Sequence, residues 1–344
     1  MEKRKGLIKR VTIKDIAERT GLAVSTVSMA INNHPKIKES TKKLVKDIAE
    51  KLHYTPNVSA RALSKRRTNL MGVLIPSVMD SFYPELIQGI EDVLFETEIN
   101  PIICHTRDNP EKEKIYFRRL LDKQVDGIIF EPPVGNQISD QLMEAKAKDV
   151  PMVAILRSMP GIDVPYVVVD NKQGAYMATK HLLELGHRNI GHLAAPAKLP
   201  ISSARIAGYR EALEEYGVEY NPNWVVESNF NWEAGMWSMR NLLSRSDNIT
   251  AVFVASDIMA VGASYAIRNF GFKIPLDMSI VGFDGLYISE VAEVPLTTVS
   301  QPRYDIGVRA ANKLLAMLNK NIEGSETLEP NLLIRASTSP PRTR

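Results

Sequence analysis

Short apolar runs alternate with amphipathic helical stretches from Asn69 to the end of the chain. The runs that predict buried strands cover residues 70–75, 102–104, 127–130, 152–156, 167–169, 190–194, 251–255, 280–283 and 298–299. Between them, the spacing of apolar residues predicts helices over residues 83–97, 111–123, 137–148, 174–185, 204–216, 233–245 and 258–269. Strands that alternate with helices favour parallel sheets covered on both faces. So many strands favour two such sheets, with a ligand cleft between them.

A helix-turn-helix pattern occupies residues 12–32, ahead of this α/β region. Thr12 followed by Asp15 is a helix-start signal, because a hydroxyl and an early carboxylate both stabilise the free N–H groups of a helix N-terminus. Gly21 supplies the backbone freedom of a sharp turn, and a second helix begins near Val24. The outward side chains of that helix are small or unbranched, so they can enter a DNA major groove without colliding with its walls. They are Val24, Ser25, Ser28 and Met29.

Two short amphipathic helices around a glycine also fit a plain helical hairpin, and the charge distribution favours DNA binding over it. Residues 1–68 hold 17 Lys and Arg against 6 Asp and Glu, a balance of +11, whereas the other 276 residues hold 26 against 34, a balance of −8. The net charge of +3 therefore conceals a basic head on an acidic body. Such a basic head is typical of nucleic-acid binding.

Two further helical segments follow in the head. Residues 40–52 predict a third helix, with Leu44 and Val45 on its buried side and Lys42 elsewhere. Residues 58–63 predict one or two more helical turns. An isolated helix of fewer than about 12 residues is marginal in water, so this last segment requires a partner to order it. DNA and a second copy of the chain are the two candidates.

The body contains none of the familiar motifs for a cofactor or a nucleophile. It lacks Gly-x-Gly-x-x-Gly after a strand, Gly-x-x-x-x-Gly-Lys-Ser/Thr, His-Glu-x-x-His and Gly-x-Ser-x-Gly. His181 and His187 lie six residues apart, a spacing that does not favour a metal site on a helix. Asp170, Asp257 and Asp284 each follow an apolar run, where the end of a strand presents a carboxylate to a cleft. Without a nucleophile, metal or cofactor motif, we expect these carboxylates to accept hydrogen bonds from hydroxyls rather than to catalyse.

Composition places the chain in a reducing compartment. Residues 1–10 are basic but lead into no apolar run, and no run approaches the roughly 20 apolar residues that span a bilayer. The lone cysteine, Cys104, excludes an internal disulfide and suits the cytoplasm. Its apolar neighbours predict a buried structural thiol. Residues 337–344 predict a frayed tail.

Motifs of the head and the body occur together in an order that indicates one family. The head contains Thr12-Ile-Lys-Asp-Ile-Ala, Ser25-Thr-Val-Ser-Met-Ala-Ile-Asn and Tyr54-Thr-Pro-Asn-Val-Ser-Ala-Arg-Ala-Leu. The body contains Gly72-Val-Leu-Ile-Pro, Val169-Asp-Asn, Arg205-x-x-Gly-Tyr, Asp257-x-x-Ala-x-Gly, Pro275-x-Asp-x-Ser-Ile-Val-Gly-Phe-Asp and Leu296-Thr-Thr-Val-x-Gln-Pro. In these motifs the chain resembles the LacI family of bacterial transcription regulators along nearly its whole length.

This resemblance implies a multidomain subunit of a homodimer. Its parts are an all-α helix-turn-helix DNA-binding head (residues 1–56), a hinge helix with a linker (57–68) and an α/β body. The body consists of two parallel-sheet lobes similar to periplasmic binding proteins. The implied N-lobe comprises residues 69–165 and 297–323, and the C-lobe comprises 166–296 and 324–339. The chain then crosses between the lobes near residues 165, 297 and 323.

The resemblance also implies the partners and the residues that bind them. The partners are pseudo-palindromic double-stranded DNA and a small sugar-like effector between the lobes, with Leu63 as a wedge between base pairs. The implied DNA-binding residues are Thr12, Val24, Ser25, Thr26, Ser28, Met29, Asn32, Tyr54, Asn57, Ala60, Arg61 and Leu63. The implied effector-binding residues are Phe82, Tyr83, Arg157, Arg205, Phe230, Trp232, Asp257 and Asp284. Arg205 and Phe230 also fit plain structural roles, Arg205 as an ion-pair partner of Glu211 and Phe230 as a packing residue.

The chain departs from the family pattern at four positions. Ala23 and Lys38 stand where relatives often have Ser, and Ala23 removes a helix N-cap whose loss typically costs about 0.5–2 kcal/mol. Leu156 replaces a frequent Asp, and Ser256 replaces a frequent Asn. Because the last two lie where relatives bind effectors, the sequence leaves the identity of the effector open.

Two other functions fit part of the sequence. A sugar-binding or sugar-transforming protein with an added helical head lacks support, because no signal peptide and no catalytic motif is visible. A regulator of the catabolite-control branch of the family takes a phosphorylated carrier protein as its corepressor.

Overall fold

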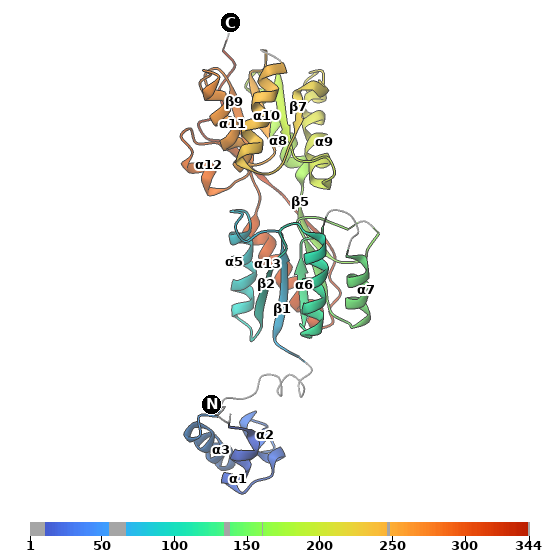
Figure 1. Cartoon of the computed structure of the whole chain (residues 1–344), viewed down its shortest axis with the longest axis vertical. Coiled ribbons are helices and arrows are strands. Elements are labelled where there is room, and N and C mark those ends of the chain that lie inside the picture. The colour runs from blue at the N-terminus through green and yellow to red at the C-terminus, as the bar shows by residue number, and fades with distance from the viewer. Residues whose placement is uncertain (1–10, 55–66, 134–137, 160, 246–247, 343–344) are drawn as a thin grey trace, which may run out of the picture. The chain divides into compact units, whose positions relative to one another are not determined.

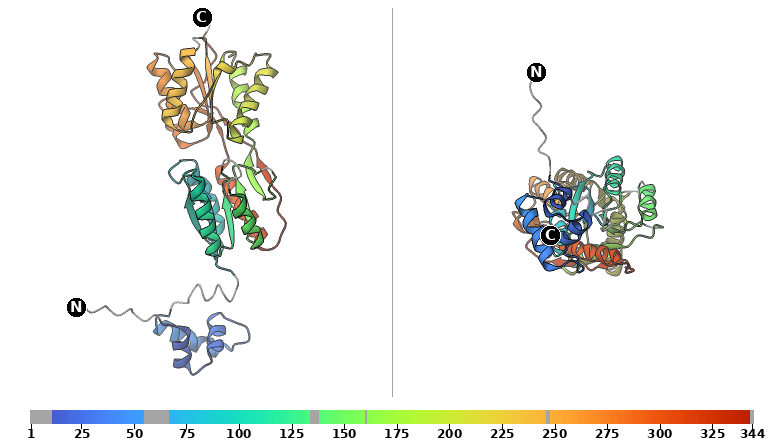
Figure 2. Two further views of the ribbon diagram at one scale, coloured as in Figure 1. Left: turned by 45° about the vertical axis from the view of Figure 1, so that its right-hand side comes forward. Right: turned by 90° about the horizontal axis from the view of Figure 1, so that it is seen from below.

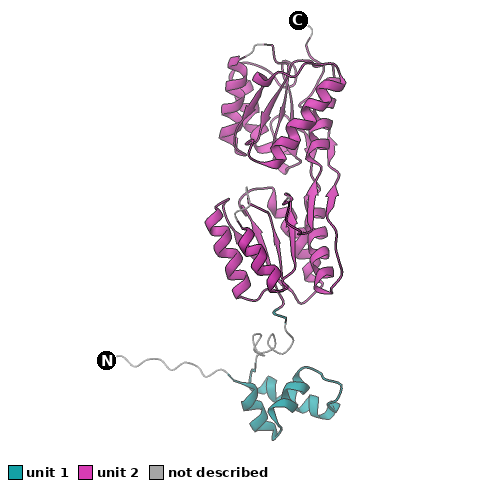
Figure 3. Ribbon diagram, turned by 90° about the vertical axis from the view of Figure 1, so that its right-hand side faces the viewer, with its two compact units in different colours: residues 1–68 teal, residues 69–344 magenta. Residues whose placement is uncertain are grey.

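The computed structural model describes residues 11–54, 67–133, 138–159, 161–245 and 248–342. The chain divides into two compact units, residues 1–68 and 69–344 (Figure 3). We call them the head and the body. The described part of the head is helical and the body is α/β with two sheets, which confirms the predicted fold class.

Three helices form the described part of the head: α1 (Ile13–Thr20), α2 (Val24–Ile31) and α3 (Glu39–Lys51) (Figure 1). Gly21 ends α1 with a φ of 68°, a left-handed conformation that glycine adopts without strain, and its N–H donates to the carbonyl of Ala17. The chain can therefore turn directly into α2, as the helix-turn-helix pattern predicts. The helices share one small core of Ile16, Ala17, Val27, Ala30 and Val45.

The buried face of α3 differs from the predicted one. Lys42 is only 8% exposed, and its ammonium group donates to the Glu39 carboxylate at 2.6 Å, whereas Leu44 is 47% exposed. A lysine can bury its aliphatic stem while its charged end reaches a carboxylate, and apolar spacing alone does not reveal this arrangement. The core therefore receives Val45 as expected, but Leu44 lies on the surface of the head.

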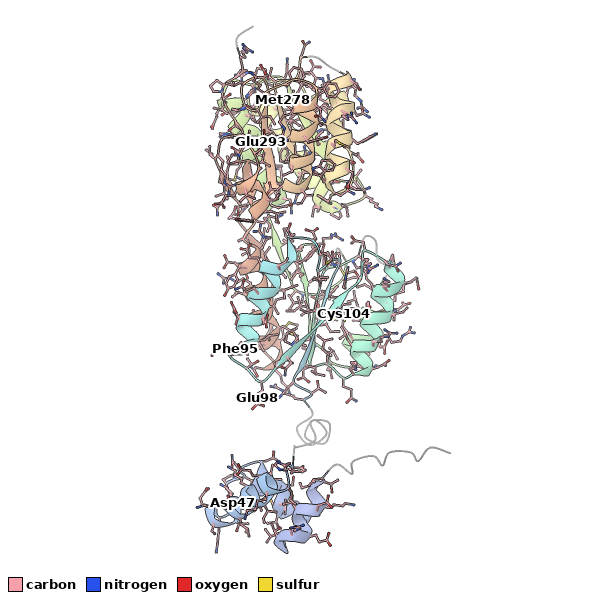
Figure 4. The ribbon with its side chains drawn as sticks, turned by 60° about the vertical axis from the view of Figure 1, so that its left-hand side comes forward. Asp47, Phe95, Glu98, Cys104, Met278 and Glu293 are labelled. Carbon is pink, nitrogen blue, oxygen red and sulfur yellow. The ribbon has the colours of Figure 1, made fainter. Side chains whose placement is uncertain are left out.

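The N-lobe of the body is built on a parallel sheet with the strand order β11-β5-β4-β3-β1-β2 (Figure 1). The strands are β1 (Leu70–Ile75), β2 (Asn100–His105), β3 (Gly127–Phe130), β4 (Met152–Ile155), β5 (Tyr166–Val169) and β11 (Glu326–Leu328). One face packs against α5 (Tyr83–Phe95) and α13 (Arg303–Leu318), and the other against α6 (Pro110–Asp122) and α7 (Ser139–Ala147). Cys104, labelled in Figure 4, is 8% exposed on β2, and burial raises the pKa of its thiol, so the prediction of a buried structural cysteine is confirmed.

The C-lobe sheet has the order β12-β10-β9-β8-β6-β7, and only β12 runs antiparallel to its neighbour. Its strands are β6 (Ile190–Ala194), β7 (Val225–Glu227), β8 (Ala251–Val254), β9 (Ser279–Asp284), β10 (Thr297–Ser300) and β12 (Asn331–Leu333). One face packs against α8 (Asn171–Glu184) and α9 (Pro200–Glu215), and the other against α10 (Trp232–Arg245) and α11 (Asp257–Asn269). Figure 2 shows helices on both sides of each sheet, the arrangement expected for buried parallel strands.

Three segments join the two lobes along one side of the body (Figure 3). The first lies between β5 and α8, the second between β10 and α13, and the third between β11 and β12. The predicted crossings near residues 165, 297 and 323 are each a few residues too early. Hydrogen bonding holds residues 166–169 and 326–328 in the N-lobe sheet and residues 297–300 in the C-lobe sheet.

Several elements escaped sequence prediction. The long helix α13 and the short strands β7, β11 and β12 were not expected, and neither were the 3-10 turn η1 (Pro222–Trp224) and the short helix α12 (Tyr287–Val291). The three strands have only three residues each, which is too short for a pattern of alternation to identify. Helix α13 has small residues on its buried side, including Gly307, Ala310 and Ala311, so few large apolar residues mark that side in the sequence.

The prediction of a frayed tail is wrong for residues 337–339, which bind to the C-lobe. The Ser337 hydroxyl donates to the Ile280 carbonyl at 2.6 Å and accepts from the Thr297 N–H at 2.8 Å. The buried His187 ring contacts the Ser339 carbonyl through Nε2 at 2.9 Å, and burial, the largest cause, lowers the pKa of this histidine. Hydrogen-bonding partners distant in sequence, which no local pattern encodes, thus order this part of the tail.

Helices α8 and α9 pack closely because Gly208 has no side chain. A Cβ atom built on Gly208 of α9 would lie 2.0 Å from the carbonyl oxygen of Lys172 on α8. The two helix backbones touch at this point, so no side chain can move aside. We expect Gly208→Ala to destabilise the body by roughly 1–3 kcal/mol, the usual cost of over-packing a core.

Urea unfolding of the purified body measures this cost through the shift of the midpoint. Gly324→Ala is the matched control, since no atom lies within 4 Å of the Cβ built there. Equal midpoints for the two variants would contradict the close contact between α8 and α9.

Candidate functional site

The outer surface of α2 is the candidate DNA-reading surface of the head. Val24 is 42% exposed and Ser25 is also exposed, whereas Thr26, Ser28 and Met29 are half-buried. Val27 and Ala30, on the opposite side of α2, are fully buried. The side of α2 that faces solvent is therefore the side that the sequence predicted.

The ends of the head helices place the other predicted DNA contacts that the structure describes. Thr12 is exposed at the start of α1, where its N–H and hydroxyl both donate to the Asp15 carboxylate at 2.7 Å. Asn32 is exposed after α2, and its side-chain amide donates to the Ser28 carbonyl at 2.9 Å. Tyr54 is half-buried against the head core. Asn57, Ala60, Arg61 and Leu63, together with most of the predicted hinge, lie outside the described residues.

Ala23 immediately precedes α2 and provides no side-chain cap, and Lys38 likewise provides none for α3. Both helices therefore begin without the hydroxyl that could accept a free N–H. The predicted loss of the cap at Ala23 is present in the folded head.

A cleft of about 760 Å³ lies between the two lobes of the body. Its walls are formed at the carboxyl ends of the parallel strands, where α/β proteins generally bind ligands. The N-lobe contributes Pro76, Ser77, Asp80, Phe82, Tyr83, Asp108, Pro110, Glu113, Glu131, Pro133, Leu156 and Arg157. The rest of the lining consists of Asn171, Pro196, Lys198, Leu199, Ile201, Arg205, Asn229, Phe230, Asn231, Ser256, Ile258, Asp284, Leu286 and Gln301.

Arg205 and Asp284 form the polar centre of the C-lobe wall. Arg205 Nη2 lies 3.8 Å from Asp284 Oδ1, and Arg205 Nε donates to the Asn171 side-chain oxygen at 2.9 Å. The guanidinium also lies 3.7 Å above the centre of the Phe283 ring. These contacts fix Arg205 in one orientation, while Glu211, its alternative partner in the sequence, pairs with Lys172 at 2.6 Å instead.

Asp284 has a backbone conformation that is rare for a residue with a side chain. Its φ is 111°, and Gln301 Nε2 donates to its Oδ1 at 2.7 Å. Burial raises the pKa of Asp284 to about 6 against the opposing effect of Arg205. Leu156, on the N-lobe wall, also has a positive φ, of 63°. Strained residues of this kind cluster at ligand-binding sites.

The N-lobe wall is organised around Glu131. Its Oε1 lies 2.8 Å from Arg157 Nη2, and its Oε2 accepts from the Tyr83 hydroxyl at 2.8 Å. Arg157 Nη1 also donates to the Pro132 carbonyl at 3.0 Å. Phe82 packs edge-on against Tyr83 with ring centres 5.4 Å apart. The structure thus brings Phe82, Tyr83 and Arg157 together in the cleft.

Two predicted effector residues do not line the cleft. Trp232 lies at the start of α10 and packs against Tyr265 of α11, with ring centres 5.4 Å apart. Asp257 is fully buried beneath the C-lobe wall, where its carboxylate accepts from the Leu286 N–H at 2.7 Å and from the Thr298 hydroxyl at 2.6 Å. The position of Asp257 directly after a strand indicated that it lies near the cleft. It did not indicate that other groups of the lobe already donate hydrogen bonds to its carboxylate oxygens.

Burial and, second, the neighbouring Asp284 carboxylate raise the pKa of Asp257 to about 8. The folded state therefore holds a proton that the unfolded chain releases near pH 4. The contribution of protonated Asp257 to the free energy of unfolding is complete below about pH 4. It decreases as the pH rises toward about 8, by up to about 1.4 kcal/mol per pH unit.

We expect Asp257→Asn to remove this slope. The amide keeps one oxygen for the Leu286 N–H, and its NH₂ can donate to the Thr298 hydroxyl, which can accept as well as donate. Urea unfolding of the wild type and the variant between about pH 5 and pH 8 measures the difference. A difference that does not grow with pH would show that Asp257 is already ionised at the lower pH.

Sequence reasoning missed several cleft residues. Glu113, Glu131, Asn171 and Gln301 have polar groups in the wall, but they lie in helices or just beyond strands. Sequence reasoning also missed Arg303 of α13, which lies outside the cleft lining: its Nε donates to Glu85 of α5 at 2.9 Å, and its Nη1 donates to the Asp284 carbonyl of the C-lobe. The position of Glu131 directly after an apolar run was the one available signal, the same signal that identified Asp284.

Ser256 and Leu156, which depart from the family pattern, both line the cleft. The Ser256 hydroxyl accepts from the Met259 N–H at 3.2 Å and so caps α11. Among the described residues, no cluster of His, Cys, Asp and Glu has the arrangement of a metal site. Within the same part of the chain, no helix has the length and apolar character to cross a membrane.

Two families match this chain in succession. Residues 12–57 match the bacterial regulatory proteins of the lacI family, and residues 68–335 match the periplasmic binding proteins and sugar binding domain of the LacI family. The first match covers the helix-turn-helix, and the second covers both lobes and the cleft.

Relatives match this chain along nearly its whole length. The HTH-type transcriptional regulator DegA of Bacillus subtilis is 36% identical over 338 residues, which cover 97% of this chain and 100% of DegA. Catabolite control protein A of Priestia megaterium is 35% identical over 320 residues, covering 93% of this chain and 96% of that protein. The structure of the Lac repressor dimer bound to operator and the anti-inducer ONPF matches with a TM-score of 0.85 at 26% identity, over 96% of this chain and 100% of that chain. This chain is therefore a member of the LacI family of bacterial regulatory proteins.

Proposed function

We propose that the protein is a homodimeric, sequence-specific DNA-binding repressor whose operator affinity is set by a small effector in the inter-lobe cleft. The observation that carries the proposal is the cleft itself. It has walls from both lobes, and a buried Arg205–Asp284 pair lies in one of them. A ligand that touches both walls favours one relative position of the lobes over another, and this difference in affinity is what an allosteric effector requires.

We assign operator reading to Val24, Ser25 and Met29. None of the three can make the paired hydrogen bonds of Arg or Asn with a base. Apolar contact of Val24 with thymine methyl groups and one hydrogen bond from Ser25 then supply limited base reading. Operator shape and dimer symmetry supply the rest, including bending by a Leu63 wedge in the minor groove.

We assign effector binding to Arg205, Asp284 and Phe230. The guanidinium donates and the carboxylate accepts, so together they can bind adjacent hydroxyls of one sugar ring. Phe230, half-buried in the cleft wall, offers a flat apolar surface to the CH face of that ring. The match of the body to a sugar-binding domain supports a sugar or sugar derivative. The assigned activity is binding rather than catalysis.

The similarity to catabolite control protein A supports a second candidate, a regulator with a phosphoprotein corepressor. Under that alternative, the phosphorylated carrier protein tightens DNA binding and sugars alone have no effect.

A thermal-shift screen of sugars, sugar phosphates and nucleosides, followed by operator titration with each stabilising compound, tests the proposal. A ligand that binds only the folded protein raises its stability. We expect one such ligand to change operator affinity at least about tenfold, which corresponds to about 1.4 kcal/mol of coupling. If ligands bind the body and none alters DNA affinity, effector control is wrong.

A further inference from the structure

The N-lobe wall of the cleft carries an excess of negative charge. Four carboxylates line it, those of Asp80, Asp108, Glu113 and Glu131, against the single guanidinium of Arg157. The lining from the C-lobe has two cations, Lys198 and Arg205, against the single carboxylate of Asp284, so its net charge is positive. A ligand spanning the cleft therefore meets an acidic wall at one end and a basic wall at the other.

Arg157 is committed to one of the four carboxylates. Its Nη2 lies 2.8 Å from Glu131 Oε1, and the other oxygen of Glu131 accepts from the Tyr83 hydroxyl. Glu131 is thus balanced in charge and satisfied in hydrogen bonding. The N-lobe lining holds no second cation for the remaining acidic side chains of this wall.

Glu113 is the unsatisfied group. This residue of α6 is 5% exposed, and its Oε1 accepts from the Thr106 hydroxyl at 3.3 Å. Its Oε2 is buried and has no hydrogen-bond partner among the described residues. A buried acceptor without a partner costs free energy, and more so when it is charged. Burial, with Asp108 adding to it, raises the pKa of Glu113 to about 7, against the opposing effects of Thr106 and Arg157.

We propose that the effector carries a protonated amine, and that this amine binds Glu113 while hydroxyls of the same molecule bind Arg205 and Asp284. The effector class is therefore an amino sugar with a free amine. This inference rests on the proposed function, since it concerns the same cleft. An amine both donates to the free Oε2 and balances the charge of the wall, whereas a neutral hydroxyl does only the first. The described acidic residues do not form a metal site, which favours an organic cation.

Calorimetry of the full chain with matched sets of sugars tests the amine. Each set contains a hexose, its 2-amino-2-deoxy and 6-amino-6-deoxy derivatives, and the N-acetylated form of each amino derivative. There is one set for each of the gluco, galacto and manno series. We expect an amino sugar of one series to bind at least about tenfold more tightly than its parent and its N-acetyl form, the usual effect of one charge-assisted hydrogen bond. The N-acetyl form keeps an N–H donor but loses the charge, so it separates the two contributions.

Glu113→Gln then identifies the partner of the amine. The change keeps the shape of the side chain and removes its charge, and we expect it to abolish the preference for the amine, so that the variant binds the amino sugar no more tightly than the parent sugar. Glu111→Gln is the matched control: Glu111 lies on the same helix, is exposed, and pairs with Lys114 at 2.9 Å outside the cleft lining. Thermal melting checks that both variants fold.

The outcomes separate this inference from the proposed function. Neutral sugars that bind as tightly as their amino counterparts overturn the amine and leave effector control intact, as does a Glu113→Gln variant that keeps the preference. If no member of any set binds, both the amino-sugar inference and the assignment of a sugar effector fail.

Discussion

The isolated body, residues 69–344, will not bind operator DNA, whereas the full chain will bind it with an affinity that falls steeply with salt. The head carries a balance of +11 and the body one of −8, so removing the head removes the entire attractive charge and leaves a repulsive one. Each phosphate that the head neutralises steepens the slope of log K against log salt by about 0.9. The loss on truncation is therefore expected to be complete at physiological salt.

Fluorescence anisotropy with the protein's own upstream DNA measures both effects. The body has its own hydrophobic cores in both lobes, so it can be purified as a folded control, and circular dichroism verifies its fold. A folded body that still binds this DNA would exclude the head as the DNA-binding unit.

Arg205→Ala will destabilise the body by roughly 3–5 kcal/mol, the cost of leaving one partner of a buried ion pair alone. Arg205 is 3% exposed and Asp284 is 8% exposed, so the carboxylate left behind has little access to water. Burial lowers the pKa of Arg205 to about 10, against the opposing effects of Asp284 and Asp257. At neutral pH Arg205 is still charged, so its removal takes away the cation that Asp284 faces.

Urea unfolding of the body measures the loss. Lys172→Ala is the matched control, because Lys172 of α8 pairs at 2.6 Å with Glu211 of α9, the helix that carries Arg205, but both side chains are about half exposed. A pair of that kind contributes roughly 0–1 kcal/mol. Similar losses for the two variants would mean that water reaches the Arg205–Asp284 pair.

Asp284→Asn is the better variant for testing the cleft, because it leaves an oxygen that can still accept from Gln301. We expect it to fold and to keep DNA binding, but to lose the response to whichever ligand the thermal screen identifies. Arg205→Ala tests stability and ligand binding together and cannot separate them.

Local patterns predicted the elements that bury a continuous apolar surface. The strands from 70–75 to 280–283 were recognisable because strands covered on both faces are apolar throughout. The turn at Gly21 and the outward side of α2 could also be predicted, since a turn and a helix depend on a few neighbouring residues. The carboxyl ends of these strands then indicated where the cleft would be.

Features that depend on distant partners could not be predicted in this way. Asp257 is buried because Leu286 and Thr298, 29 and 41 residues further along the chain, donate hydrogen bonds to its carboxylate. Glu113 lies in the cleft wall only because α6 packs against the N-lobe sheet with this residue facing the cleft. The short edge strands β11 and β12 form only when the sheets they extend already exist.

The three crossings between the lobes set the order in which a nascent chain can complete its parts. The head is one continuous stretch and can fold as soon as it leaves the ribosome. Neither lobe can: the N-lobe waits for α13 and β11, and the C-lobe waits for β12 and the tail at Ser337. Until residues 326–333 are made, each lobe therefore lacks an edge strand of its sheet, while the DNA-binding head is already formed.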